Sequence, residues 1–557
     1  MSDSSRLFGL PYSDSLGYLI GALRLNAGLT LLEFSGRRPL YSGYLSSLVE
    51  LTGRSLSTAC IIQSILVGLA LCWYGEQALS RFGGVVTALT VALISVFFLR
   101  FAGKTMTENL GLVLALLAWG FFYRWRRRQL RSDLLLGYLT LSLGLVARAG
   151  PFFMLPAILL CLARERPKPL SAWTTVVLCA LAIIPFALAR AYLFRFGSSE
   201  TQGFSNFSYT LYGVARGGKG WMYANQVLGA HVTTAEVYRA ALASIRSAPG
   251  LFAFGALRSI FDFFSPSIHA ATGFASIVVP GRLRTPIWLV SQLAFLVGLT
   301  VFFRRRTIAS DRFDLWAMAG VIASLPFAPP IDADAMRAHT IAIPLVATVC
   351  AVGVAEIWNS LRWLATRIPT VRVFGADGSG ALGQATSVPL RFFPEALLGA
   401  IALLLIRPLL RHTPVSDTRR QMDAAAVFDT SSDHLECGRS RSFTLDHLLP
   451  PVRISSAEQL ASTQRRHPYP FLFEPLKRAF KNAGPYSLSY ALVEESGTVA
   501  AVALPNELTR DDAPREEPLR ICADKLVLSP SEAQALPVDS KGAFVLLVAT
   551  DISARTR

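Results

Sequence analysis

The 557-residue sequence is poor in charge, histidine and cysteine. Only 16% of its residues are charged, and it contains seven histidines and seven cysteines. No CxxC pair or His-rich spacing occurs, which excludes the common zinc and dithiol motifs. Residues 1–12 are too short and too polar for a cleavable signal peptide.

Apolar sequence is abundant. Hydrophobic residues make up 52% of the chain, and the mean hydropathy is +0.42. This composition predicts an α-helical polytopic membrane protein. The net charge of +17 does not indicate nucleic acid, because the basic residues occur in short groups between apolar runs and not on one soluble module.

Residues 14–34 and 38–51 have helical spacing interrupted by polar residues, which predicts amphipathic helices on the outer membrane surface within residues 14–54. The segments that follow are predicted to span the membrane. They lie at 55–74, 85–101, 108–123, 133–148, 151–163, 172–194, 286–303, 313–328, 340–358 and 392–406.

The loops between these spans give an orientation. Basic groups at 124–131, 164–168, 304–306 and 362–372 fall on one face when the spans alternate. The positive-inside rule makes that face cytoplasmic. The opposite face receives the segment 195–284 and the residues that carry the chemistry below.

The tail has a different character. A Gly/Ser-rich linker at about 375–387 and one last span precede residues 411–557, which are polar with β-like runs at 487–493, 498–504 and 543–549. We expect a transmembrane domain over 1–410 and a small soluble β-rich domain over 411–557, on the outer face. Cys437 and Cys522 would then meet oxidising conditions and are predicted to form a disulfide, the alternative being two unrelated thiols.

Two acids lie at predicted outer ends of helices. Asp14 has the position of a general base for a hydroxyl-bearing substrate, and Glu108 lies at the start of a span. The structural alternatives are an N-cap for Asp14 and a favourable helix-dipole position for Glu108. Six side chains are predicted to bind an anionic substrate group, the alternative for several of them being contact with lipid headgroups. They are Arg38, Lys104, Arg148, Lys219, Arg337 and His339.

The order of these features resembles the GT-C superfamily of polytopic glycosyltransferases, most closely the bacterial relatives of protein O-mannosyltransferases and the lipid A aminoarabinose transferase. The resemblance rests on 13–18, 37–41, 107–109, 206–221 and 332–344. It implies catalytic acids at Asp14 and Glu108, a polyprenyl-phosphate-sugar donor, and a lipid, glycan or protein acceptor. Members of that family have a membrane helix before the catalytic aspartate, and no such helix is predicted here.

The sequence therefore predicts an inverting glycosyltransferase in the bacterial inner membrane, surrounded by membrane lipids. No metal ligand set is assigned, and a divalent ion is left open because two acids supply too few ligands. A lipid or polysaccharide transporter or flippase is one alternative, and a catalytically inactive membrane scaffold is another. A transporter is expected to have ionisable residues near the midplane and internal repeats.

Overall fold

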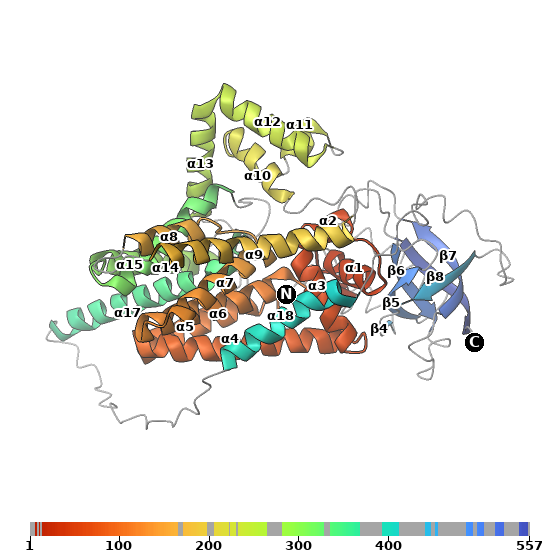
Figure 1. The fold of residues 1–557 in the computed structure, drawn as a ribbon, viewed down its shortest axis with the longest axis horizontal. Helices are drawn as coiled ribbons and strands as arrows, with labels where there is room; N and C mark the ends of the chain where they lie inside the picture. The colour runs from red at the N-terminus through yellow and green to blue at the C-terminus, as the bar shows by residue number, and fades with distance from the viewer. Residues whose placement is uncertain are drawn as a thin grey trace.

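The computed structural model describes the helical part of the chain and separate strands of the tail (Figure 1). The described residues are 6–7, 10–11, 14–164, 171–197, 205–221, 223–229, 232–264, 281–327, 335–367, 393–411, 441–446, 452–454, 486–493, 498–505, 519–527 and 545–554. Cys437 lies outside them, so the predicted Cys437–Cys522 disulfide stays a prediction.

Helices dominate the described residues. They are α1 (Asp14–Asn26), α2 (Glu33–Gly36), α3 (Pro39–Leu51), α4 (Leu56–Phe82), α5 (Gly84–Phe98), α6 (Thr107–Arg128), α7 (Arg131–Ala147), α8 (Met154–Ala163), α9 (Ala172–Phe196), α10 (Asn206–Ala215), α11 (Tyr223–Leu228), α12 (Thr234–Ser247), α13 (Pro249–Phe263), α14 (Gly281–Arg304), α15 (Ala309–Ser324), α16 (Ala335–Ala338), α17 (Ile343–Arg367) and α18 (Phe393–Arg411), with 3₁₀ turns η1 (Leu325–Phe327) and η2 (Thr340–Ala342).

Short strands complete the described elements. A hairpin joins β1 (Arg6–Leu7) and β2 (Leu10–Pro11). In the tail, β3 (Arg441–Asp446), β4 (Val452–Ile454), β5 (Tyr486–Val493), β6 (Thr498–Pro505), β7 (Leu519–Val527) and β8 (Val545–Ala554) form one sheet in the order β3-β7-β8-β6-β5-β4, with a further β3–β5 pairing. Strand β6 pairs with β8 in parallel, and the other pairings of this sheet are antiparallel.

The helical bundle has the dimensions and surface of a multi-pass membrane protein. Among the described residues, five helices are long and apolar enough to cross a membrane, and a sixth span is counted if the bent pair α12–α13 is taken as one. Their outer surfaces expose large apolar side chains such as Trp173 (74%), Phe194 (92%) and Leu403 (72%). Exposed apolar surface of this extent is stable only against lipid or another apolar partner.

The ten predicted spans correspond to α4–α9, α14, α15, α17 and α18, although α4 and α6 extend eight and five residues beyond the predicted ends at 74 and 123. Helices such as α5 and α8 are shorter than a full span. Helix α6 carries polar residues within the bundle. This is possible because all its residues from Thr107 to Trp125 are buried. A helix shielded by its neighbours does not have to meet the lipid's demand for apolar side chains.

The prediction of one-sided amphipathic helices within 14–54 is wrong. Helix α1 is buried from Ser15 to Leu23, and α3 is buried from Pro39 to Val49. Their polar residues bind other helices: Asn26 Nδ2 donates to the Ser46 carbonyl at 3.3 Å, and Ser47 Oγ donates to the Leu404 carbonyl at 2.7 Å. Both helices are therefore part of the bundle core.

Ion pairs at one end of the bundle join the basic loops. Arg81 at the end of α4 binds Asp311 (3.1 Å) and Asp314 (2.6 Å) at the start of α15. Arg124 near the end of α6 binds Asp133 of α7 at 2.7 Å and also Glu395 at the start of α18. The loops that follow α4, α6 and α14 therefore meet at this end.

Helix α18 runs from that basic end toward the opposite end. Its first turn is held by the Arg124–Glu395 pair, while Arg407 in its last turns binds Glu50 of α3 at 3.2 Å. Helix α6 begins at the opposite end, so α18 is antiparallel to it. The tail after Arg411 therefore starts at the end that contains the first turn of α6, in agreement with the predicted sidedness.

Two glycines let α14 and α17 touch along their backbones. A Cβ atom on Gly298 would lie 1.9 Å from the Val349 carbonyl oxygen, and one on Gly353 would lie 1.8 Å from that of Ala294. Close backbone approach through small residues is a common way to pack membrane helices.

We therefore expect Gly353→Ala to lower the free energy of unfolding by about 1–3 kcal/mol, because the helices must separate. Gly68→Ala on α4 is the matched control, since nothing lies within 4 Å of its added methyl group. Thermal unfolding in detergent tests the pair. Equal melting temperatures for the two variants would contradict this account of the crossing.

Candidate active site

Four segments distant in sequence meet at the end opposite the basic loops. Asp14 begins α1, and Glu108 lies in the first turn of α6. Arg148 follows the last residue of α7, and Arg337 lies in α16. Helix ends are suited to this purpose, because a side chain there can reach a neighbouring helix end without crossing the apolar core.

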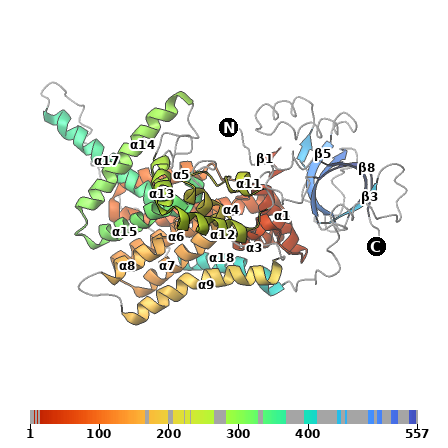
Figure 2. The ribbon, with the colours of Figure 1, turned by 90° about the horizontal axis from the view of Figure 1, so that it is seen from above.

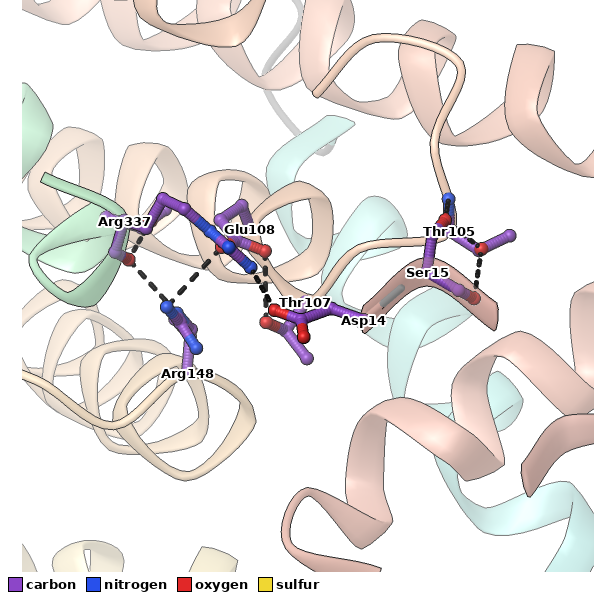
Figure 3. Close-up of polar contacts among 8 residues, drawn as sticks. Asp14, Ser15, Thr105, Thr107, Glu108, Arg148 and Arg337 are labelled. Atoms are coloured by element: carbon purple, nitrogen blue, oxygen red, sulfur yellow. Dashed lines mark hydrogen bonds and ion pairs between the residues drawn. The ribbon is translucent and has the colours of Figure 1, made fainter. Parts of the chain in front are cut away.

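Arg337 bridges the two acids (Figure 3). Its Nη2 donates to Asp14 Oδ2 at 2.8 Å, and its Nε donates to Glu108 Oε1 at 2.6 Å. Arg148 completes the group, since its Nη2 lies 3.4 Å from Glu108 Oε1 and its Nε donates to the Arg337 carbonyl at 3.0 Å. We call Asp14, Glu108, Arg148 and Arg337 the acid–arginine cluster.

The start of α1 is fixed to the segment that leads into α6. The hydroxyl groups of Ser15 and Thr105 lie 2.6 Å apart, Thr105 N donates to Ser15 Oγ, and Thr105 Oγ1 donates to the Ser15 carbonyl at 2.7 Å. Asn109 Nδ2 donates to the Lys104 carbonyl and closes the same turn. Asp14 is thereby held beside Glu108, and its carboxylate binds Arg337.

A glycine brings the two arginine segments together. A Cβ atom on Gly150 would lie 1.7 Å from the Ala338 carbonyl oxygen, so no other residue fits without moving the backbone. Gly150 lies two residues after Arg148, and Ala338 follows Arg337. Thr340 Oγ1 then donates to the Arg337 carbonyl at 2.7 Å and holds this turn before α17.

The two acids differ in accessibility. The side chain of Glu108 is 0% exposed, whereas that of Asp14 is 33% exposed and that of Arg337 is 22% exposed. Thr107 Oγ1 donates to the second carboxylate oxygen of Glu108 at 3.1 Å. Glu108 is therefore enclosed by donors, while Asp14 and Arg337 are partly exposed.

Two further arginines experience the field of the cluster. Burial lowers the pKa of Arg38 to about 10, with the Arg148 charge acting in the same direction and Tyr18 and Glu108 opposing it. Burial also lowers the pKa of Arg100 to about 10, helped by Arg337 and opposed by Glu108. Both remain cations at neutral pH. For Arg337, burial lowers the pKa, but the negative charges of Glu108 and Asp14 outweigh this and raise it above its ordinary value.

Arg100 was not predicted as a site residue, because the predicted span 85–101 included it. Helix α5 ends at Phe98, so Arg100 lies in the turn that leads toward Glu108. Its position as an arginine at the outer end of an apolar run was the sequence feature that could have identified Arg100 as a site residue. Arg38, Arg100, Arg148 and Arg337 give four cations near two acids, so the site carries an excess of positive charge and favours an anion.

His339 does not add to that charge, contrary to the prediction. It is 1% exposed, and burial together with the Arg148 charge lowers its pKa to about 4. It is a buried group that is neutral at neutral pH.

This burial predicts a pH dependence of stability. The folded-state pKa of His339 lies below the ordinary value of 6.5, so the unfolded chain binds a proton that the folded protein excludes. Stability is complete above pH 6.5 and falls as the pH decreases toward 4. We expect His339→Asn to remove part of this slope, measured as melting temperature against pH. An unchanged slope in that variant would contradict burial of a neutral His339.

Lys219 is not part of the cluster. It is exposed in the turn between α10 and α11 and lies over the ring of Tyr223 at 6.0 Å. Residues 206–215 form helix α10. The turn that follows caps this helix. Gly217 N donates to the Val214 carbonyl, and Lys219 N donates to the Gly213 carbonyl. Lys104 is half-buried in the turn before α6.

Within the residues that the structure describes, no group of three or more His, Cys, Asp and Glu side chains has the arrangement of a metal site. No protein-family model, curated protein or solved structure matches the chain. The fold defines a multi-pass helical membrane protein with a charged cluster of two acids and several arginines at one end of its bundle.

Proposed function

We propose that the protein is a membrane glycosyltransferase that transfers a sugar from a polyprenyl-phosphate donor to a hydroxyl-bearing lipid, glycan or protein acceptor. The observation that carries the proposal is the bridge from Arg337 to Asp14 and Glu108 at the end of the bundle opposite the basic loops. It combines a reachable carboxylate with reachable guanidinium groups. The resemblance to the GT-C superfamily supports the choice of sugar transfer, with the bacterial inner membrane as the location.

Asp14 is assigned as the general base because it is the accessible acid of the pair. It takes the proton of the acceptor hydroxyl as that oxygen forms a bond to the anomeric carbon. The bond from that carbon to the phosphate oxygen breaks on the opposite face, and the polyprenyl phosphate leaves with the electron pair. The configuration of the sugar is therefore inverted.

Glu108 is assigned as a positioning residue. It is completely buried and touches both Arg337 and Arg148, so it holds the two guanidinium groups without reaching the substrate. Guanidinium groups bind phosphate oxygens in pairs of parallel hydrogen bonds. Arg38 and Arg100 add positive charge that favours the leaving phosphate.

Donor binding and base activation are linked through Arg337. In the structure its Nη2 donates to Asp14 Oδ2, so this carboxylate oxygen is engaged by Arg337 and not by an acceptor hydroxyl. A donor phosphate competes for the same guanidinium group, which is 22% exposed. Once Arg337 turns to the phosphate, Asp14 is free to accept the acceptor's proton.

The arginines provide a test of this assignment. We expect Arg337→Lys and Arg148→Lys to weaken binding of a polyprenyl-phosphate analogue about tenfold or more, because lysine keeps the charge but loses the paired hydrogen bonds. Acceptor binding should change less. Arg407→Lys, in the Glu50 pair at 21% exposure, is the matched control. Normal analogue binding by both site variants would show that the proposed phosphate site is wrong.

The alternative functions are less well supported. A transporter is expected to hold ionisable groups at the middle of its spans. In the described residues the acid–arginine cluster and the Arg81 and Arg124 pairs lie at helix ends. In a catalytically inactive scaffold, the accessible Asp14–Arg337 ion pair would contribute to stability alone.

We propose that residues 411–557 form a soluble β-domain on the same side as the cluster. The β3–β5 pairing joins the two sides of the sheet, and β6 and β8 are parallel, which is the connectivity of a five-stranded OB barrel with β4 added to β5. The direction of α18 supports the side. This sidedness is tested in intact cells by labelling cysteines introduced into the tail and into α12. An impermeant reagent should reach both sites. Labelling of α12 alone would place the tail on the other side of the membrane.

A further inference from the structure

The unit formed by α10–α13 has a surface that the proposed chemistry does not use. It rises from one side of the helical bundle in Figure 1 and lies over the bundle in the view from above (Figure 2). Helices α10, α11 and α12 share a small core of Tyr212, Ala224, Val237 and Ala241. Helix α13 is bent from α12 by 109° and leads back to the bundle, where Phe264 packs on Phe295 of α14.

One face of α13 is fixed by close contact with α10. A Cβ atom on Gly255 would lie 2.1 Å from the Val214 carbonyl oxygen and 2.6 Å from Gly218 N. Ser259, one turn later, is buried. These two positions mark the face of α13 that packs on α10.

The outer face of α13 is apolar and exposed. Phe254, Leu257 and Phe261 are 58%, 57% and 72% exposed, and their spacing of three and four residues places them on one stripe. A helix that exposes three large apolar side chains on one face requires an apolar partner for that face.

Positive charge surrounds this stripe. Residues 205–264 contain five Lys and Arg residues against two acidic residues. All five cations are exposed; they are Arg216, Lys219, Arg239, Arg246 and Arg258. An apolar helical face accompanied by exposed cations is the pattern of a helix that lies in the interface of an anionic bilayer.

We propose that the α12–α13 corner is a monotopic membrane anchor, with the Phe254–Leu257–Phe261 stripe in the acyl region and the cations against anionic headgroups. The occupant is the lipid bilayer, because Phe264, directly after α13, packs on Phe295 of α14, and the α14 residues Leu289, Val290 and Leu293 are themselves exposed on a span. The proposal does not rest on sugar transfer. It makes the α10–α13 unit part of the membrane surface and not a freely moving outer loop.

The test uses the full-length protein reconstituted into vesicles. A fluorescent amino acid replaces Phe254 in one variant, Leu257 in a second, and exposed Gln226 of α11 in a control. We expect bromine on the lipid acyl chains to quench emission at 254 and 257 at least twofold more than at 226, and iodide in the water to show the opposite order. Equal quenching by iodide at all three positions, or no quenching at 254 and 257 by either agent, overturns the proposal: the first result places the stripe in water, the second under protein.

The cations are tested separately. Arg239→Glu combined with Arg246→Glu should reduce acyl-chain quenching at 254 in vesicles of phosphatidylglycerol and leave it unchanged in vesicles of phosphatidylcholine. Both arginines lie on the exposed face of α12, away from the acid–arginine cluster. A charge-reversed variant that behaves like the unmodified protein in both vesicles overturns the assignment to anionic headgroups.

Discussion

Asp14→Asn is expected to reduce sugar transfer by about 10²–10⁴-fold, the usual loss when a general base is removed. The amide has the shape of the carboxylate, so the start of α1 and the Ser15–Thr105 contacts should persist. It accepts a hydrogen bond from Arg337 through its oxygen but cannot take a proton from an acceptor hydroxyl. Expression and membrane insertion should be normal, and donor binding should be retained.

Glu50→Gln is the matched control for this variant. Glu50 has the same side-chain exposure as Asp14, 33%, and pairs with Arg407, which is 21% exposed against 22% for Arg337. Loss of such an ion pair costs little by itself. If Asp14→Asn and Glu50→Gln transfer sugar at equal rates, Asp14 is a structural residue and the base lies elsewhere.

Glu108→Gln is expected to have the largest effect on stability. Removing the charge leaves Arg148 and Arg337 without their buried counter-ion, and breaking a buried pair in this way costs about 3–5 kcal/mol. Glu108 is 0% exposed, so water cannot replace the lost interaction at the carboxylate. The melting temperature in detergent should fall clearly below that of Glu50→Gln, for which we expect less than about 1 kcal/mol.

A second variant separates the loss of the pair from a general weakening of the fold. Adding Arg337→Gln to Glu108→Gln removes the unmatched cation, so the double variant should lose less stability than the sum of the two single variants. Strict additivity would contradict direct coupling between Glu108 and Arg337. A Glu108→Gln variant as stable as the unmodified protein would contradict the buried position of the carboxylate.

The sequence was sufficient to predict the apolar helices of the bundle and which residues lie at the same end of it. Apolar runs located the ten helices that correspond to the predicted spans, and the alternation of basic loops placed Asp14, Glu108, Arg148 and Arg337 on one face. The pairing itself was not predictable, because it depends on local contacts such as that of Gly150 with the Ala338 carbonyl. Spacing along the chain does not show that Arg337 reaches Asp14 across 323 positions.

The errors arose where burial overrides pattern. Helices α1 and α3 alternate polar and apolar residues as a surface helix does, but their polar groups bind other helices inside the bundle. His339 lies two residues after Arg337 and was predicted to bind phosphate, yet burial lowers its pKa and keeps it neutral. Lys219 lies beside the glycines that cap α10 and is not part of the acid–arginine cluster. For the two helices and for His339 the decisive quantity was exposure to water, which composition and periodicity do not give.

The central claim is tested most directly by following a labelled sugar. Membranes that contain the protein are incubated with polyprenyl phosphates carrying different radiolabelled sugars, and the label is traced in lipid, glycan and protein fractions. The account predicts that one donor transfers its label to an acceptor in membranes with the unmodified protein and in those with Glu50→Gln, but not in those with Asp14→Asn. Label that stays on the carrier in all three membranes, or moves equally in all three, would contradict the assignment of this protein as a glycosyltransferase with Asp14 as its base.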